Sequence, residues 1–119
     1  MASPSILMVV DEQQIRSLLS ITFTRAGFQV TTASNGLDAV GCCSAQPFDV
    51  VLSDVTMPEM DGHQLMSWIA LHHPHTRSVL MSGCDTKCDN CACSPRCPLI
   101  AKPFKPAEAV NAVRRVLAA

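Results

Sequence analysis

Apolar runs and stretches with helical spacing alternate along this 119-residue chain. Residues 6–10, 50–53 and 79–82 are nearly continuous apolar runs, as expected of strands buried in a parallel sheet. Residues 29–33 alternate around β-branched side chains, and residues 99–101 form a short fifth run. Strands that alternate with helices along a chain generally pair in parallel, with helices covering both faces of the sheet. The sequence therefore predicts a single α/β domain over residues 1–119.

Four segments have the apolar spacing of helices. The first runs through residues 15–23 and is followed by Gly27, a residue type common just after a helix end. Shorter patterns cover residues 37–44 and the segment after Gly62, and the last helix begins near Pro106, since proline is favoured in a first turn. The inner face of this last helix is expected to be Ala109, Val110, Val113 and Leu117. No helical pattern lies between the fourth and fifth strands.

Composition argues against several classes of protein. The net charge of −1 provides no large basic surface for direct nucleic-acid binding. No apolar run approaches the ~18 residues of a membrane span, and the N-terminus lacks the pattern of a secretory signal. We therefore expect a cytoplasmic protein without membrane contact. In that reducing compartment, clustered cysteines are typically metal ligands or redox groups.

Polar residues follow the predicted strands at the points where these end. Asp11 and Glu12 follow the first strand, Asp54 follows the third, Ser82 closes the fourth, and Lys102 follows the fifth. Parallel α/β sheets bind ligands at the carboxyl ends of their strands, where strand order reverses. Neighbouring carboxylates repel unless a cation lies between them, and oxygen ligands with room for water suit Mg²⁺. A lysine beside such a site suits a phosphoryl group, whose oxygens need cationic partners.

These residues and their spacing resemble the receiver domain of bacterial two-component response regulators. The matching stretches are residues 6–16, residues 48–62 with the segment DVTMPEMDG, residues 79–83 and residues 101–104. The resemblance covers the whole chain except about residues 84–98. It implies a flavodoxin-like, doubly wound, five-stranded parallel sheet with the strand order 2-1-3-4-5. It also implies a phosphoacceptor signalling domain rather than an enzyme, with slow self-dephosphorylation as its only hydrolytic activity.

The resemblance assigns a magnesium site and a phosphoacceptor. Asp54 would accept a phosphoryl group from a sensor histidine kinase or a phosphotransfer protein. Asp11, Asp54 and the backbone carbonyl of Thr56 would bind Mg²⁺, with a weak contribution from Glu12.

The same resemblance assigns the contacts of the phosphoryl group. Lys102 would contact its oxygens, aimed by Pro103 at the family's cis-proline position. Ser82 would swing in to hydrogen-bond the group, and this would change the conformation at the face of the fourth and fifth strands. The family commonly docks partners and dimerises on the face of its fourth helix, so a homodimer would form there.

Two positions depart from the family pattern. The family has two consecutive acids after the first strand, and alignment on Ile15 and Arg16 makes Asp11 the second and places Val10 where the first belongs. We therefore expect weaker Mg²⁺ binding or slower phosphorylation than is usual in the family. Leu99 occupies the position of the family's switch aromatic, so an aromatic-rotamer readout of phosphorylation is not expected.

Five cysteines lie between Cys84 and Cys97, where the fourth helix should be. Residues 84–98 contain no Leu, Ile, Val, Met or aromatic side chain, so a helix there would have no apolar face to bury. Five thiols could supply four ligands to Zn²⁺ or hold an iron–sulfur cluster in place of that helix. The favoured ligands are Cys84, Cys88, Cys91 and Cys97, with Cys93 as the alternate.

Two other interpretations of this segment stay open, namely a redox switch through disulfide exchange and a loop with free thiols. A metal or redox group here would suggest a second function, a metal- or redox-sensing binding module on a degenerate receiver scaffold. Phosphotransfer from a small phosphodonor would distinguish the two functions. Outside this segment, Cys42 and Cys43 are expected to pack as small apolar residues, and His72, His73 and His75 to lie at a helix end.

Overall fold

The computed structural model describes residues 3–54, 62–82, 99–101 and 105–118. Over these ranges, strands and helices alternate as the sequence predicts. The elements are β1 (Ser5–Val9), α1 (Gln13–Arg25), β2 (Gln29–Ala33), α2 (Gly36–Ala45), β3 (Val50–Asp54), α3 (Gly62–His72), β4 (Arg77–Ser82), β5 (Leu99–Ala101) and α4 (Pro106–Ala118).

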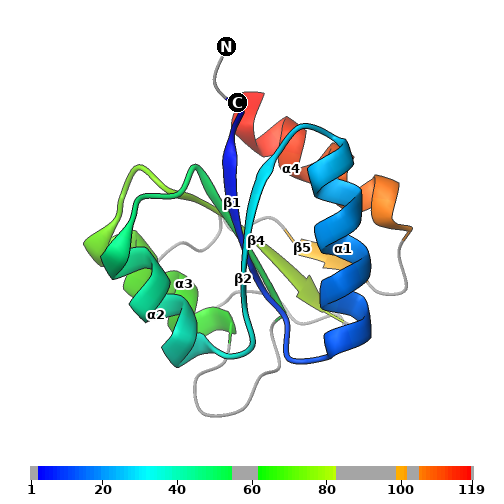
Figure 1. Cartoon of the computed structure of the whole chain (residues 1–119). Coiled ribbons are helices and arrows are strands. Elements are labelled where there is room, and N and C mark those ends of the chain that lie inside the picture. Colours follow the sequence, from blue (N-terminus) through cyan, green and yellow to red (C-terminus); the bar gives the residue numbers. More distant parts are fainter. Residues whose placement is uncertain (1–2, 55–61, 83–98, 102–104, 119) are drawn as a thin grey trace.

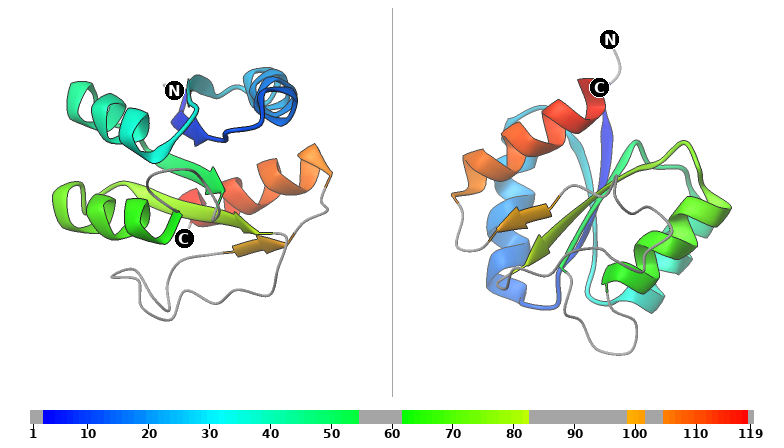
Figure 2. Two further views of the ribbon diagram at one scale, coloured as in Figure 1. Left: turned by 90° about the horizontal axis from the view of Figure 1, so that it is seen from below. Right: turned by 180° about the vertical axis from the view of Figure 1, so that it is seen from behind.

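The five strands form one parallel sheet in the order β2-β1-β3-β4-β5. Helices α1 and α4 cover one face of the sheet, and α2 and α3 cover the other (Figure 1 and Figure 2). The flavodoxin-like architecture and its strand order are therefore confirmed. From β1 the chain passes outward to β2 and returns on the other side of β1 as β3, so the strand order reverses between β1 and β3.

Alternate residues of β1 belong to two separate hydrophobic cores. Ile6, Met8 and Val10 pack with residues of α1 and α4. Leu7 and Val9 pack on the opposite face, with residues of α2 and α3. Successive side chains of a strand point to opposite faces, so a central strand that is buried on both sides reads as a continuous apolar run.

The helix ends agree with the turn residues of the sequence. Gly27, just beyond α1, has a positive φ of 96°, a conformation that glycine adopts without steric cost. Helix α2 begins at Gly36, because Asn35 caps it: the Asn35 Oδ1 accepts a hydrogen bond from the Asp38 amide at 2.8 Å. The Asp38 carboxylate in turn accepts hydrogen bonds from Ser34 and from the Asn35 side chain, which ties down the turn between β2 and α2.

Strand β4 begins at Arg77, two residues before the apolar run that predicted it. The Arg77 amide donates to the Asp49 carbonyl at 3.0 Å, and Arg77 pairs with Val50 in the sheet register. The Asp49 carboxylate also accepts a hydrogen bond from the Ser5 amide at 2.8 Å. Ladder hydrogen bonds involve the backbone, so a strand can extend into polar residues that hydrophobicity alone does not mark.

Several predictions for particular segments fall outside the described residues. These include the cysteine-rich segment 84–98, with Cys84, Cys88, Cys91, Cys93 and Cys97, and also Thr56, Lys102 and Pro103. Replacement of the fourth helix by a metal-bound segment therefore stays a prediction. In the part of the chain that is described, no helix has both the length and the apolar character needed to cross a membrane.

Candidate functional site

The ends of β1 and β3 bring two acidic residues to one edge of the sheet. In the parallel register of these strands, Val9 lies beside Ser53. Asp54 comes one residue after Ser53, and Asp11 comes two residues after Val9. The two acids that sequence analysis assigned to the cation site therefore lie at adjacent strand ends, at the position where strand order reverses.

The ends of β4 and β5 lie at the same edge. Asp54 pairs with Met81, so Ser82 is the next residue along β4. Ser82 pairs with Ala101, the last residue of β5. Lys102 directly follows Ala101 in the sequence but lies outside the described residues. The register thus brings the backbone of Ser82 to the edge that carries Asp54.

Asp54 is nearly buried, with 4% of its surface exposed. It lies at the end of a fully buried strand, and its backbone carbonyl accepts a hydrogen bond from the Ser53 hydroxyl at 2.9 Å. Burying an ionised carboxylate is costly unless compensating charge or hydrogen bonds are present. A cation bound at this position would supply such charge, and the small exposed fraction is the access that remains for a reactant.

The link between β1 and α1 carries two exposed carboxylates, those of Asp11 and Glu12. Glu12 is the N-cap residue of α1, but its side chain makes no capping hydrogen bond. The first turn of α1 contains no acidic residue. The negative charge of this link therefore comes from Asp11 and Glu12, beside the carboxyl end of β1.

Val10 occupies the position where the family pattern has its first acid. Its side chain is fully buried, with 0% exposed, and its amide donates to the Ala33 carbonyl of β2 at 3.1 Å. Continuing the β1–β3 register by one residue places Val10 alongside Asp54. The extended register thus places an apolar residue alongside Asp54, at a position where the family pattern has a carboxylate.

Arg16 is a residue of this edge to which sequence analysis gave no role. Its Nη1 donates to the Val10 carbonyl at 2.7 Å and, at a longer 3.4 Å, to the Asp11 carbonyl. In the sequence, Arg16 is visible only as a basic residue in the first helical turn after an acid at a strand end. That pattern does not indicate a hydrogen bond back to the strand, because the side chain could equally point to solvent.

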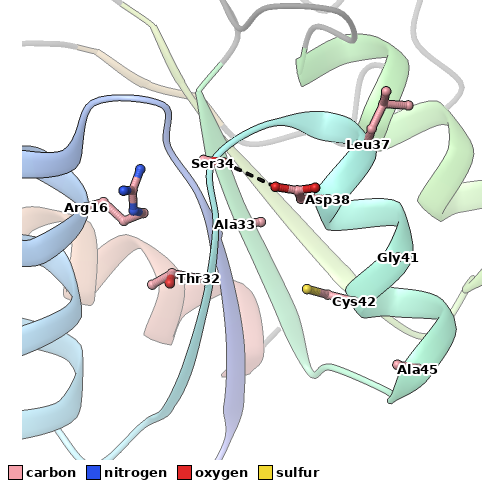
Figure 3. Close-up of a pocket in the computed structure, with 9 residues that line it drawn as sticks. All are labelled: Arg16, Thr32, Ala33, Ser34, Leu37, Asp38, Gly41, Cys42 and Ala45. Atoms are coloured by element: carbon pink, nitrogen blue, oxygen red, sulfur yellow. Dashed lines mark hydrogen bonds between the residues drawn. The ribbon is translucent and has the colours of Figure 1, made fainter.

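An open groove lies beside this edge, between α1 and α2 and over the end of β2 (Figure 3). Arg16 stands on the α1 side and Asp38 on the α2 side, where the Ser34 hydroxyl donates to it. The groove does not include Asp11 or Asp54. It is lined by Arg16, Thr32, Ala33, Ser34, Leu37, Asp38, Gly41, Cys42 and Ala45.

The histidines and the paired cysteines take the places that were predicted for them. Helix α3 ends at His72, whose ring stacks on Trp68 with ring centroids 4.5 Å apart. Cys43 is buried in the core beneath α2, and Cys42 is half-buried against the same core. Over the described ranges, no three His, Cys, Asp or Glu side chains are arranged to hold a metal ion.

Cys43 should react with alkylating reagents far more slowly than Cys42. Burial, and to a lesser extent the neighbouring Cys42, raises the pKa of the Cys43 thiol from 9.0 to about 11, and only the thiolate is an effective nucleophile. Because this folded-state value lies above the unfolded one, the contribution of Cys43 to stability is complete below pH 9 and is lost as the pH rises through about 11. Iodoacetamide labelling with peptide mass spectrometry measures both rates; equal rates in the native protein would contradict the burial argument.

Comparisons with known proteins agree with this geometry. The family profile described as response regulator receiver domain matches residues 6–114. The transcriptional regulatory protein SrrA of Staphylococcus aureus strain NCTC 8325 is 33% identical over 117 residues, which cover 97% of this chain and 48% of SrrA. The transcriptional regulatory protein GltR of Pseudomonas aeruginosa is 41% identical over 68 residues, 57% of this chain and 28% of GltR. The chain thus spans less than half the length of these curated relatives.

Solved structures share the fold over almost the full length. The chemotaxis response regulator CheY4 of Vibrio cholerae superposes with a TM-score of 0.84 at 26% identity, covering 96% of this chain and 98% of CheY4. The signal receiver domain of an HD domain-containing protein from Pseudomonas fluorescens Pf-5 gives a TM-score of 0.88 at 24% identity, covering 98% of this chain and 95% of that chain.

Proposed function

Because the chain belongs to the response regulator receiver domain family, we propose that Asp54 is the residue that accepts the phosphoryl group. The observation that carries the proposal is the strand register: Asp54 ends the central strand β3, next to the end of β1 with Asp11 and the end of β4 with Ser82. In a doubly wound sheet this is the position at which ligands bind.

The proposed reaction is a single phosphoryl transfer onto a carboxylate. An oxygen of Asp54 attacks the phosphorus of a phosphohistidine in line with the leaving nitrogen. The phosphorus–nitrogen bond breaks with its electron pair going to the histidine, and a phosphorus–oxygen bond forms on Asp54. Phosphoryl transfer depends mainly on positioning and on neutralising charge at the transferred group. Self-dephosphorylation would be the slow attack of water on the same acyl phosphate.

The residues at the edge fit a magnesium ion. Asp11, Asp54 and the Thr56 carbonyl would hold it, with a weak contribution from Glu12. The donor set consists of oxygens, two of them from carboxylates at adjacent strand ends, which is the chemistry that Mg²⁺ prefers. When bound, the ion would neutralise charge on the phosphoryl oxygens and offset the burial of the Asp54 carboxylate.

Ser82 and Lys102 would respond to the phosphoryl group once it is on Asp54. Ser82 follows Met81, which pairs with Asp54, and Lys102 follows Ala101, which pairs with Ser82. Lys102 would pair with the phosphoryl oxygens, and the Ser82 hydroxyl would donate to one of them. Movement of Ser82 would change the conformation at the face of β4 and β5, which is the proposed signal. A homodimer would form on the face where the family has its fourth helix.

The proposed donor is a sensor histidine kinase or a phosphotransfer protein in the cytoplasm. SrrA and GltR are named transcriptional regulatory proteins, and this chain corresponds to less than half of each. We expect the chain to regulate a partner or a further domain through its phosphorylated state, without binding nucleic acid directly.

A small-molecule phosphodonor tests the function directly. Incubation with acetyl phosphate and Mg²⁺ should add one phosphoryl group, which peptide mass spectrometry should locate on Asp54, and a chelator of divalent cations should prevent the addition. A wild-type protein that gains no phosphoryl group at millimolar Mg²⁺, or gains it on another residue, would contradict the proposal.

We further propose that the cysteine-rich segment binds Zn²⁺ or an iron–sulfur cluster through Cys84, Cys88, Cys91 and Cys97, with Cys93 as the alternate. The support is the sequence: these thiols are spaced like metal ligands, in a segment without Leu, Ile, Val, Met or aromatic side chains for packing. This cofactor would make the chain a sensor of metal or redox state in addition to its signalling role.

Elemental analysis of protein purified without chelator should find about one equivalent of zinc, or iron with matching sulfide, per chain. Removal of the metal should expose thiols to a colorimetric reagent. The control is a variant with Cys42 and Cys43 replaced by Ala, which should retain the metal. Absence of stoichiometric zinc and iron from freshly purified protein would exclude the metal interpretation and leave the redox and free-thiol alternatives.

A further inference from the structure

We propose that Arg16 is a positioning residue for the cation site, because it holds the backbone that carries Asp11. The inference rests on the proposed Mg²⁺-dependent function and adds to it a residue that does not touch the ion. Its basis is the set of hydrogen bonds that Arg16 makes to the link between β1 and α1.

Arg16 binds three consecutive backbone carbonyls of that link. Its Nη1 donates to the Val10 carbonyl at 2.7 Å and to the Asp11 carbonyl at 3.4 Å. Its backbone amide donates to the Glu12 carbonyl at 3.0 Å. The amide bond is the ordinary first hydrogen bond of α1 and would form with any residue except proline at this position. The side chain itself thus engages the carbonyls of Val10 and Asp11, in the segment that carries both exposed carboxylates.

Val10 has other contacts that hold it in place, whereas Asp11 depends mainly on Arg16. The Val10 amide is held by the Ala33 carbonyl of β2, and its side chain is buried in the core with Ile6 and Met8. Because the Val10 carbonyl also accepts the bond from Arg16, Val10 is held through its amide, its side chain and its carbonyl, and it provides a rigid support for Asp11. Asp11 itself is exposed, and within the described part of the chain the hydrogen bond to its carbonyl is the longer one from Arg16. The orientation of Asp11 therefore depends on Arg16 more than that of Val10 does.

The positioning role matters more in this chain than the family pattern would require. Because Val10 replaces one acid, Asp11 and Asp54 are the main carboxylates assigned to the ion, and only the weak contribution of Glu12 could compensate for a displaced Asp11. An arginine suits the task because its planar guanidinium stays charged and can bond two carbonyls at once, whereas a lysine ammonium is a compact point charge. Residues that orient metal ligands typically change metal affinity 10–100-fold when they are replaced.

The test compares Mg²⁺ binding by Arg16→Met and Arg16→Lys with that of the wild type, by calorimetric titration at a temperature well below unfolding. Arg16→Met should raise the Kd for Mg²⁺ about tenfold, and Arg16→Lys should give a smaller increase. At saturating Mg²⁺ the rate of phosphorylation by acetyl phosphate should recover to the wild-type value, because Arg16 does not contact the reacting atoms. Amide hydrogen exchange at residues 10–12 should be faster in Arg16→Met.

Arg25→Met is the matched control, since Arg25 is exposed in the last turn of the same helix. It should leave the Kd for Mg²⁺ and the exchange at residues 10–12 unchanged. A lower melting temperature for Arg16→Met with an unchanged Kd would show a purely structural role and overturn the inference, while the proposed function would stand. Failure of the wild type to bind Mg²⁺ would instead overturn both. If Arg16→Met does not fold, an unchanged Kd and unchanged exchange in Arg16→Lys would overturn the inference.

Discussion

Asp54→Asn should reduce phosphoryl incorporation from acetyl phosphate by about 10³-fold or more, to the background of the assay. The carboxamide keeps the shape of the side chain but is a very poor nucleophile toward phosphorus. The folded protein should survive the change, because asparagine fits the nearly buried position of Asp54 with almost the same volume. Radiolabel incorporation and thermal unfolding measure the two effects.

Asp38→Asn is the matched control for this variant. Asp38 is exposed at the start of α2, and its amide bonds the Asn35 side chain, so the same chemical change leaves the helix cap in place. Incorporation by Asp38→Asn should equal that of the wild type. Full labelling of Asp54→Asn, or equal loss in both variants, would show that Asp54 is not the acceptor.

Val10→Asp should increase the affinity for Mg²⁺ about tenfold, because it restores a carboxylate at the position where the family has its first acid. A gain of roughly 1.4 kcal/mol of attraction for the ion corresponds to that factor. Without Mg²⁺ the same variant should lose roughly 3–5 kcal/mol of stability, since a buried charge is then left uncompensated. The melting temperature of Val10→Asp should therefore rise with added Mg²⁺ much more steeply than that of the wild type.

Val10→Asn separates charge from packing in this experiment. The asparagine side chain has almost the same shape as aspartate, so Val10→Asn loses the same apolar contact with Ile6 and Met8 but adds no charge. Its affinity for Mg²⁺ should not exceed that of the wild type, and Mg²⁺ should not restore its stability selectively. If Val10→Asp and Val10→Asn respond alike to Mg²⁺, or if the wild type already binds as tightly as Val10→Asp, Val10 is not the cause of a weakened site.

The strands and the acidic residues could be predicted because their signals are local. The apolar run of residues 6–10 indicates a buried strand whatever the rest of the chain contains. The acids that follow it are then recognised from their position directly after the strand. Arg77 and Ser78 could not be assigned to β4 in this way. Their place in the strand depends on hydrogen bonds to the segment around Asp49, 28 positions earlier in the chain. A strand boundary that depends on a distant partner carries no local hydrophobic signal.

Within the site, the residues with family counterparts were identified and the supporting residue was not. Asp11 and Asp54 stand out by charge and spacing, and the register of β1 with β3 places them at adjacent strand ends. Arg16 has an ordinary sequence context, and its role appears only in the 2.7 Å bond from its guanidinium to the Val10 carbonyl. Such a bond depends on where the side chain turns relative to the strand, and many directions are compatible with one position on a helix.

The amino-acid order alone determined which segments become strands and helices and which acids follow them, because periodicity and turn chemistry act over a few neighbouring residues. The tertiary structure decided that the buried Val10 lies alongside Asp54 in the sheet register. It also decided that the Arg16 guanidinium donates to the Val10 carbonyl in the link between β1 and α1. The first relation joins β1 and β3, which meet only once the sheet is paired. The second lies within six residues, but periodicity does not indicate in which direction the Arg16 side chain turns.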